Sequence, residues 1–202
     1  IARIHADTTM REFLREDGSA CHIVVFDPVS GKALDRPAGQ GYAPGSSWSR
    51  GQAWALYGFT LSHINTGEVR YLDAARKSAR YFISHIREDG LTDSDFCQPP
   101  DEDRIDNIAG AVAACGLLEL SGIVEEDEAR LFRDAALRLL KAQYDLCADF
   151  TQASGGILQK CTASYHDDGA GRHVNILYGD YFFVEALCKL RGTDARLWMA
   201  RA

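Results

Sequence analysis

The chain has 202 residues, of which 46% are hydrophobic and 25% are charged. These shares are ordinary for a globular protein, and they exclude disordered, collagen-like and low-complexity chains. The formal net charge is −7, which argues against a nucleic-acid partner because binding to phosphates needs a basic face. No apolar run approaches the ~20 residues needed to span a bilayer, so we expect no membrane partner either.

The first quarter of the chain is predicted to hold one helix and one short hairpin. Residues 2–16 fit a helix. Residues 19–34 alternate weakly between apolar and polar and are interrupted by turn-forming pairs, as a strand or hairpin would be. Residues 36–47 are rich in Gly, Pro and Ser. We expect them to form a loop of the kind that often carries function.

Helical periodicity is clear from residue 51 onwards. The first apolar stripe consists of Trp54, Tyr57, Gly58, Leu61 and Ile64. Later stripes consist of Leu72, Ala75, Ala79 and Phe82, of Ile108, Val112, Cys115 and Leu118, and of Ala129, Phe132, Ala136 and Leu139.

A last helix is expected at about residues 178–190, after an acidic loop at 93–106 and a long irregular stretch at 148–174. Roughly six helices with alternating short and long connections predict an all-α toroid or solenoid. The long loops should then lie together on one rim, where a pocket is expected.

The six cysteines indicate a reduced protein. None forms a C-x-x-C pair or a zinc-ligand spacing with a histidine, and cysteines within apolar helices behave as small hydrophobic residues. We therefore expect free, mostly buried thiols. Since no secretory signal pattern is present, a cytoplasmic location is favoured.

The densest cluster of recognition chemistry lies where the loop meets the first periodic helix. It contains two tryptophans, an arginine and a glutamine within seven residues, Trp48-Ser49-Arg50-Gly51-Gln52-Ala53-Trp54. An indole can stack on a sugar ring, and a guanidinium matches a carboxylate. The alternative is that both tryptophans belong to the core and that Arg50 forms a surface ion pair.

Two polar residues of the preceding segment are further candidates. His22 lies in the predicted strand and has a side chain suited to acid–base work near neutral pH. Gln40 lies between two glycines, where the backbone can approach a ligand. Either residue could equally be structural.

Acidic and histidine-rich segments elsewhere favour structural roles. Asp106 precedes a predicted helix and is an N-cap candidate, so capping explains it better than catalysis. His166 and His173 lie in the long irregular stretch, but their spacing fits no recognised metal-ligand motif. We expect no metal site.

Taken together, the motifs resemble the unsaturated glucuronyl hydrolases, glycoside hydrolase family 88. The central match is the stretch at residues 48–59, which begins with the tryptophan–arginine motif. Further matches follow in the family's order and cover nearly the whole chain, among them Asp17-Gly18-Ser19, Tyr71-Leu72-Asp73 and Tyr178-Gly179-Asp180-Tyr181-Phe182.

The resemblance implies an (α/α)6 barrel, of which residues 1–202 would form about the C-terminal half as one partial domain. It implies removal of a 4,5-unsaturated uronate from the non-reducing end of oligosaccharides that polysaccharide lyases leave behind. In this family the vinyl ether is hydrated, without a metal or organic cofactor. The implied partner is an unsaturated uronate oligosaccharide, and an open barrel edge would allow self-association.

Carried over by motif, the implied substrate-binding residues are His22, Gln40, Arg50 and Trp54. The family's two catalytic aspartates belong to the part of the barrel that would precede Ile1, so the catalytic residues are unknown here and the isolated chain should be inactive. The chain departs from the family at Asn175, where a serine usually helps to hold the uronate carboxylate. Two alternatives remain: an unsaturated rhamnogalacturonyl hydrolase, and a non-catalytic carbohydrate-binding helical module.

Overall fold

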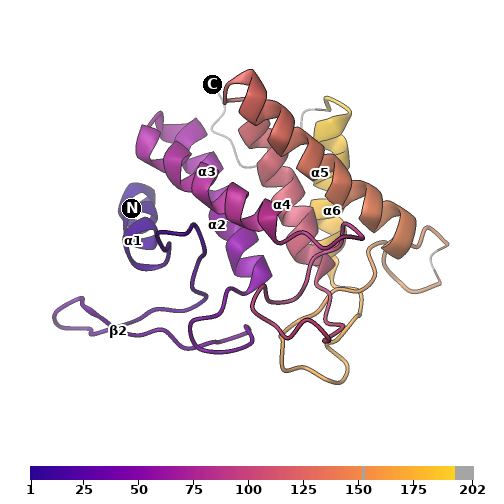
Figure 1. Cartoon of the computed structure of the whole chain (residues 1–202), viewed down its shortest axis with the longest axis horizontal. Helices are drawn as coiled ribbons and strands as arrows, with labels where there is room; N and C mark the ends of the chain where they lie inside the picture. The colour runs from indigo at the N-terminus through magenta and orange to yellow at the C-terminus, as the bar shows by residue number, and fades with distance from the viewer. Residues whose placement is uncertain (152, 194–202) are drawn as a thin grey trace.

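The computed structural model describes residues 1–151 and 153–193, and within them the fold is almost entirely helical (Figure 1). The helices are α1 Ala2–Glu12, α2 Ser49–Thr66, α3 Val69–Ser84, α4 Asn107–Ser121, α5 Glu126–Cys147 and α6 Leu177–Leu190. A two-stranded antiparallel hairpin, β1 Val25–Phe26 and β2 Ala33–Asp35, is the sheet found in this part of the chain. The predicted helices are confirmed, and the segment predicted as a strand or hairpin forms a hairpin; His22, which was expected in a strand, lies before β1 instead.

The first helix is shorter than predicted, ending at Glu12 rather than at residue 16. Beyond it the backbone turns back on itself: Leu14 pairs with Ala20, and the Arg15 N–H donates to the Ser19 carbonyl at 2.8 Å. The Asp17 carboxylate accepts hydrogen bonds from the Ser19 N–H and hydroxyl. This compact turn competes with the last helical turn, because short polar side chains bond readily to nearby backbone.

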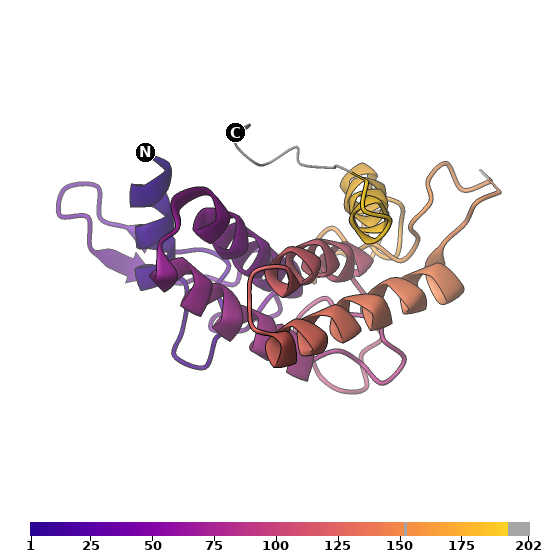
Figure 2. The same cartoon turned by 90° about the horizontal axis from the view of Figure 1, so that it is seen from above.

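Two helical hairpins, α2–α3 and α4–α5, make up the centre of the molecule, and α4 is the most buried helix. Its small residues allow close approach: a Cβ on Gly116 would lie 3.0 Å from the Cα of Tyr57 in α2. From above, α3 and α5 lie along one side, while α1 and α6 stand at the two ends of the opposite side (Figure 2).

The stripes predicted for α3 and α5 face the core, but the stripe predicted for α2 does so only in part, through Tyr57, which is buried, and Leu61, which packs against the core. Trp54 is 38% exposed and Gly58 is exposed, whereas Gln52, Ala53 and Leu56 are fully buried. The reason is that α2 carries apolar or small residues on every side, so the helical period alone cannot select the buried face.

The loops at residues 36–47 and 93–106 lie on the same rim, as predicted, and the two segments pair directly. Trp48 forms an isolated bridge with Asp95, and the Phe96 N–H donates to the Ser47 carbonyl at 3.0 Å. The stretch after α5 joins them, since the Tyr165 N–H donates to the Gln40 carbonyl at 2.9 Å. These loops form the lower edge of the molecule in Figure 1.

All six cysteines are free, as expected; Cys97 is exposed, Cys188 is half-buried and the other four are buried. Among the described residues, no helix is long and apolar enough to cross a membrane.

Candidate functional site

A cavity of about 590 Å³ lies between α1, the segment after its turn and the outward face of α2. Three of the four predicted binding residues line it: His22, Gln40 and Trp54. Three residues that were predicted to share one binding site therefore lie around one cavity. Further lining residues are Ala2, His5, Ala6, Thr9, Phe13, Trp48, Gly51, Ala55, Gly58 and Ser62.

Hydrogen bonds to the backbone fix the chemical state of His22. The Gln40 N–H donates to its Nδ1 at 2.9 Å, so the neutral ring carries its proton on Nε2. Burial lowers the pKa of His22, and the nearby Arg50 charge acts in the same direction. The Ala38 carbonyl, 3.2 Å from Nδ1, acts in the opposite direction, because it can accept a hydrogen bond only from a ring protonated on Nδ1. His22 is therefore a neutral side chain with an Nε2–H to donate.

Gln40 lies against His22 and is anchored at three points. Its N–H donates to His22, its carbonyl accepts from Tyr165, and its side-chain amide donates to the Ala163 carbonyl. This fixes the loop that closes one end of the cavity. The two glycines that flank Gln40 allow the backbone this close approach; Gly39 has a φ of +60°.

The two tryptophans of the motif have different environments. Trp54 is partly exposed, and its ring packs edge-on against Phe182 of α6 with centroids 5.2 Å apart. Trp48 is buried, and its ring lies 4.2 Å from the His22 ring and 4.8 Å from the Arg50 guanidinium carbon. Trp54 thus offers a face to a ligand, whereas Trp48 supports His22.

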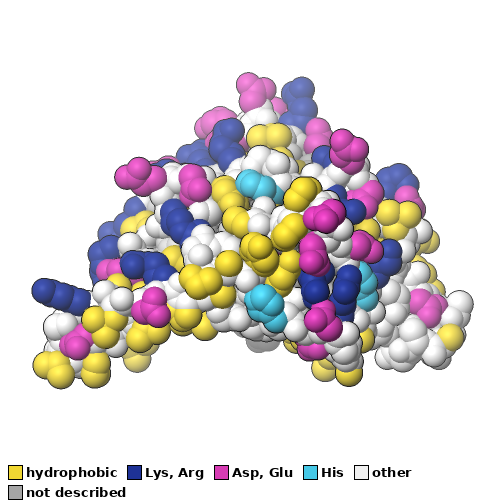
Figure 3. All heavy atoms as spheres, turned by 60° about the horizontal axis from the view of Figure 1, so that its bottom comes forward, with side chains coloured by type: hydrophobic (Ala, Val, Ile, Leu, Met, Phe, Trp, Pro, Cys, Tyr) yellow, Lys and Arg dark blue, Asp and Glu magenta, His cyan; other side chains and the backbone are white. Residues whose placement is uncertain are grey.

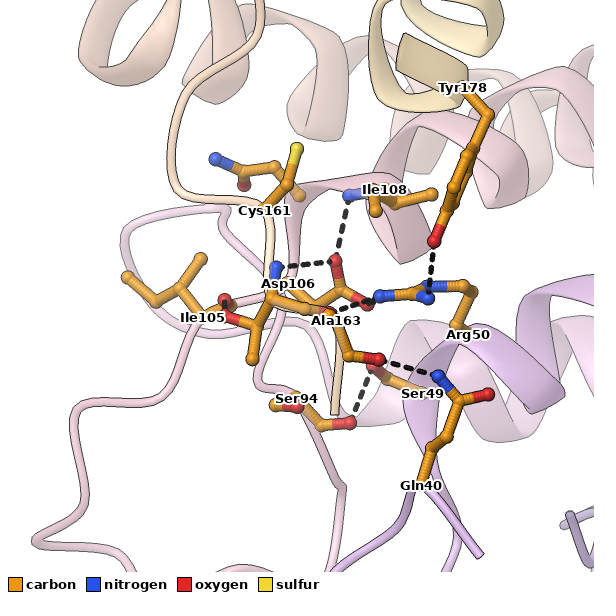
Figure 4. Close-up of polar contacts among 12 residues, drawn as sticks. Gln40, Ser49, Arg50, Ser94, Ile105, Asp106, Ile108, Cys161, Ala163 and Tyr178 are labelled. Atoms are coloured by element: carbon orange, nitrogen blue, oxygen red, sulfur yellow. Dashed lines mark hydrogen bonds and ion pairs between the residues drawn. The ribbon is translucent and has the colours of Figure 1, made fainter. Parts of the chain in front are cut away.

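Arg50 does not line the cavity, although the sequence places it one turn from Trp54. Its side chain is only 3% exposed and pairs with Asp106 (Figure 4). The Nε donates to Asp106 Oδ2 at 2.9 Å, Nη2 reaches the same carboxylate and the Thr162 carbonyl, and Nη1 donates to the Tyr178 hydroxyl at 2.9 Å. The alternative from the sequence was a surface ion pair; the structure shows instead an ion pair that is buried at both partners.

The acidic residues of the 93–106 loop are engaged in holding the rim together. Asp106 caps α4 by accepting from the Ile108 N–H at 3.2 Å, as predicted. Asp95 is buried and accepts from the Tyr42 N–H and the Ser46 hydroxyl. Asp93 pairs with Arg87 at 2.8 Å. Within the described ranges, no carboxylate lines the cavity.

Several lining residues were missed by the sequence analysis. His5 and Thr9, four residues apart on α1, face the cavity together with Ala2 and Ala6. Their spacing on one helical face was the available signal, but nothing in the sequence showed that α1 packs beside α2. On the rim face, hydrophobic side chains gather centrally, with acidic and basic side chains mixed beside them (Figure 3).

No family model matches the chain, but known proteins resemble it closely. It is 36% identical over 207 aligned residues to the unsaturated glucuronyl hydrolase of Bacillus sp. (strain GL1). The match covers 100% of this chain and 54% of the relative. A crystal structure of that hydrolase superposes with a TM-score of 0.91, covering 99% of this chain and 54% of that one. The chain is a homologue of the unsaturated glucuronyl hydrolases.

Other members of glycoside hydrolase family 88 agree. An unsaturated chondroitin disaccharide hydrolase from Streptococcus pneumoniae is 29% identical over 94% of this chain and 48% of its own length. An unsaturated glucuronyl hydrolase specific for heparin gives a TM-score of 0.87 at 29% identity, over 98% of this chain and 54% of that one. The chain thus spans about half the length of the curated relatives it matches, and its fold corresponds to about half of their (α/α)6 barrel.

Proposed function

We propose that this chain supplies the substrate-binding wall of an unsaturated glucuronyl hydrolase. The cavity offers one exposed indole face, a neutral imidazole donor and a backbone-anchored glutamine, which is chemistry suited to a sugar. Related proteins carry such ligands: a Streptococcus agalactiae hydrolase, 28% identical to this chain, is described in complex with dGlcA-GalNAc6S. The proposed ligand is an unsaturated uronate at the non-reducing end of a lyase-generated oligosaccharide.

The proposed reaction is hydration of the 4,5 double bond. A carboxylic acid gives its proton to C4, and water adds its hydroxyl to C5. The second proton of the water passes to the carboxylate. The resulting hemiketal opens by breaking the bond between C5 and the ring oxygen, and the hemiacetal left at C1 then breaks its bond to the rest of the oligosaccharide, which leaves an open-chain keto acid. In this scheme Trp54 stacks on the ring, His22 donates its Nε2–H to a sugar oxygen, and Gln40 closes the end of the cavity.

The observation that carries the proposal is the composition of the cavity wall: it has binding groups but, within the described residues, no carboxylate. General acid catalysis needs an acid within hydrogen-bond reach of the atom that receives the proton. Asp95 and Asp106 are engaged in structural contacts. We therefore propose that residues 1–202 bind the sugar and that the acid comes from residues outside this chain.

The test combines a binding and an activity measurement on the purified chain. We expect an unsaturated glucuronyl disaccharide to change the tryptophan fluorescence saturably, and Trp54→Ala to abolish that response. The ultraviolet absorbance of the double bond should stay constant over a long incubation. Loss of absorbance would show that a carboxylate has been misassigned, and replacing Asp93, Asp95 and Asp106 by Asn one at a time would identify it.

The same titration separates the alternative functions. Preference for an unsaturated rhamnogalacturonyl disaccharide would move the chain to the pectin-directed group with the same chemistry. Equal binding of saturated and unsaturated disaccharides would favour a carbohydrate-binding module, since such a module has no need to recognise the double bond. Absence of any binding would overturn the proposal.

A further inference from the structure

Tyr178 is an exposed phenol that lies against a buried cation. It is the second residue of α6, and 38% of it is exposed. Arg50 Nη1 donates to its hydroxyl oxygen at 2.9 Å, and the guanidinium carbon lies 5.4 Å from the ring centroid. No acceptor for the phenol's own proton is recorded in residues 1–151 and 153–193. The O–H is therefore available to a ligand.

Arg50 itself is poorly placed to hold an external anion. Its side chain is 3% exposed, and its Nε and Nη2 are directed at Asp106 and the Thr162 carbonyl. Nη1, the nitrogen that remains, already donates one of its two hydrogens to Tyr178. A carboxylate cannot form the paired contact that makes arginine a strong anion receptor, because one edge of the guanidinium is already taken by Asp106.

Two contacts place Tyr178 within reach of Trp54. Arg50 and Trp54 of α2 are four residues apart, and they contact Tyr178 and Phe182 of α6, which are also four apart. The contacts follow the same order along both helices, so α2 and α6 run in the same direction, with α4 packed against each of them. Tyr178 lies about 6 Å along the helix from the position opposite Trp54, since four residues rise by that amount. This offset is comparable to the width of one sugar ring.

We propose that Tyr178 makes the direct hydrogen bond to the uronate carboxylate, and that Arg50 and Asp106 are positioning residues that act through it. The inference rests on the proposed function, because it assumes a uronate on Trp54. A guanidinium that donates to the phenol oxygen strengthens the phenol as a donor, as hydrogen bonds in a chain polarise one another. Asp106 holds the Arg50 guanidinium in place. The buried positive charge of Arg50 then attracts the ligand carboxylate through the Tyr178 hydroxyl.

The test compares two ligands on three proteins. The ligands are an unsaturated glucuronyl disaccharide and its carboxyl methyl ester, titrated by tryptophan fluorescence. The proteins are the wild-type chain, Tyr178→Phe, and the control Tyr181→Phe, which removes a hydroxyl from the same helix. We expect Tyr178→Phe to weaken binding of the acid by about tenfold to a hundredfold, the usual effect of losing a hydrogen bond to a charged group. Binding of the ester, and both affinities of Tyr181→Phe, should be unchanged.

A second variant tests the positioning role. Arg50→Lys keeps a positive charge beside Asp106 but cannot contact Tyr178 at the same time, because lysine lacks the planar fork. If Arg50 acts through Tyr178, the double variant Arg50→Lys/Tyr178→Phe should bind the acid no more weakly than Tyr178→Phe alone. Additive losses would show that Arg50 acts independently of Tyr178 and would overturn the positioning role.

The remaining outcomes separate the two proposals. If the wild-type chain binds the acid and Tyr178→Phe binds it equally well, the inference is wrong and the proposed function stands. If Tyr178→Phe weakens the acid and the ester alike, the phenol does not hold the carboxylate and the inference is again wrong. If the wild-type chain binds neither ligand, the proposed function fails, and this inference fails with it.

Discussion

Gly39 is the residue on which the position of His22 depends. It has a φ of +60°, and a Cβ built on it would lie 2.3 Å from His22 Nδ1. The same backbone carries the Gln40 N–H that fixes the imidazole. A side chain at position 39 would thus strain the backbone and would also collide with His22. Because His22 lines the cavity, the collision would disturb the cavity wall.

Replacing Gly39 by alanine should therefore impair sugar binding. The new Cβ must displace the imidazole and break its bond to Gln40, so we expect Gly39→Ala to weaken binding of the unsaturated disaccharide by about tenfold. Gly45→Ala is the matched control: Gly45 also has a positive φ, +83°, but no atom lies within 4 Å of its added Cβ. Both variants should lose about 1 kcal/mol of stability from backbone strain. Equal sugar affinity in the two would show that His22 does not contact the ligand.

At this scale the sequence predicted residue types better than their surroundings. Trp54, His22 and Gln40 were predicted from local chemistry and motif, and they do line one cavity. The environment of Arg50 could not be predicted, because its partners lie 56, 112 and 128 residues away in the chain. A guanidinium that suits an external carboxylate suits Asp106 equally well, and only the folded structure distinguishes the two.

At the scale of elements, α6 is attached to the rest of the fold by a buried polar network. The Tyr57 hydroxyl of α2 donates to Glu185 of α6, which is only 4% exposed. Lys189 lies 3.2 Å from Glu185 and also pairs with Glu119 of α4. Burial and the neighbouring Glu185 raise the pKa of Tyr57, so it remains a neutral donor. Three helices thus meet at one charged cluster.

Removing the Tyr57 hydroxyl should loosen this attachment. Tyr57→Phe keeps the ring but leaves Glu185 with one donor fewer, so we expect a loss of about 1.5–3 kcal/mol in the free energy of unfolding. Urea unfolding followed by circular dichroism measures it. Tyr144→Phe is the control, because Tyr144 is 56% exposed on α5 and should change stability little. An unchanged midpoint for Tyr57→Phe would show that the other contacts of Glu185 satisfy it without the Tyr57 hydroxyl.

The predicted elements show which patterns carry information. For α3 and α5 the apolar pattern predicted both the helix and its buried face, because each helix is amphipathic and covered on one side. For α4, which is buried nearly all round, the predicted stripe covered only part of the buried surface. The alternation of short and long connections predicted that the rim loops lie together, but not which residues pair. Bridges such as Trp48 with Asp95 could not be predicted, because they join residues that are distant in sequence.

At the scale of the whole molecule, one side of the helical array is largely uncovered by the residues that the structure describes. Helices α3 and α5 cover the outer side of α2 and α4, and the opposite side holds the cavity and α6 (Figure 2). The outward face of α6 carries an apolar stripe of Leu177, Tyr181 and Val184, which are 84%, 36% and 44% exposed. Their spacings of four and three residues place them on one helical face. Such contiguous apolar surface is a usual site of association.

This surface leads to the expectation that the chain self-associates through α6. We expect sedimentation velocity to show concentration-dependent dimers or larger species. Leu177→Lys with Val184→Lys should raise the dissociation constant more than about tenfold, because burying one such side chain is worth about 1.5–3 kcal/mol. Leu137→Lys on α5 is the matched control, since Leu137 is 42% exposed on a different helix. If the α6 double variant and the α5 control changed the dissociation constant equally, the contact between copies would lie elsewhere than on α6. A monomer at every concentration would show that this apolar face stays exposed to water, and it would contradict the expected self-association.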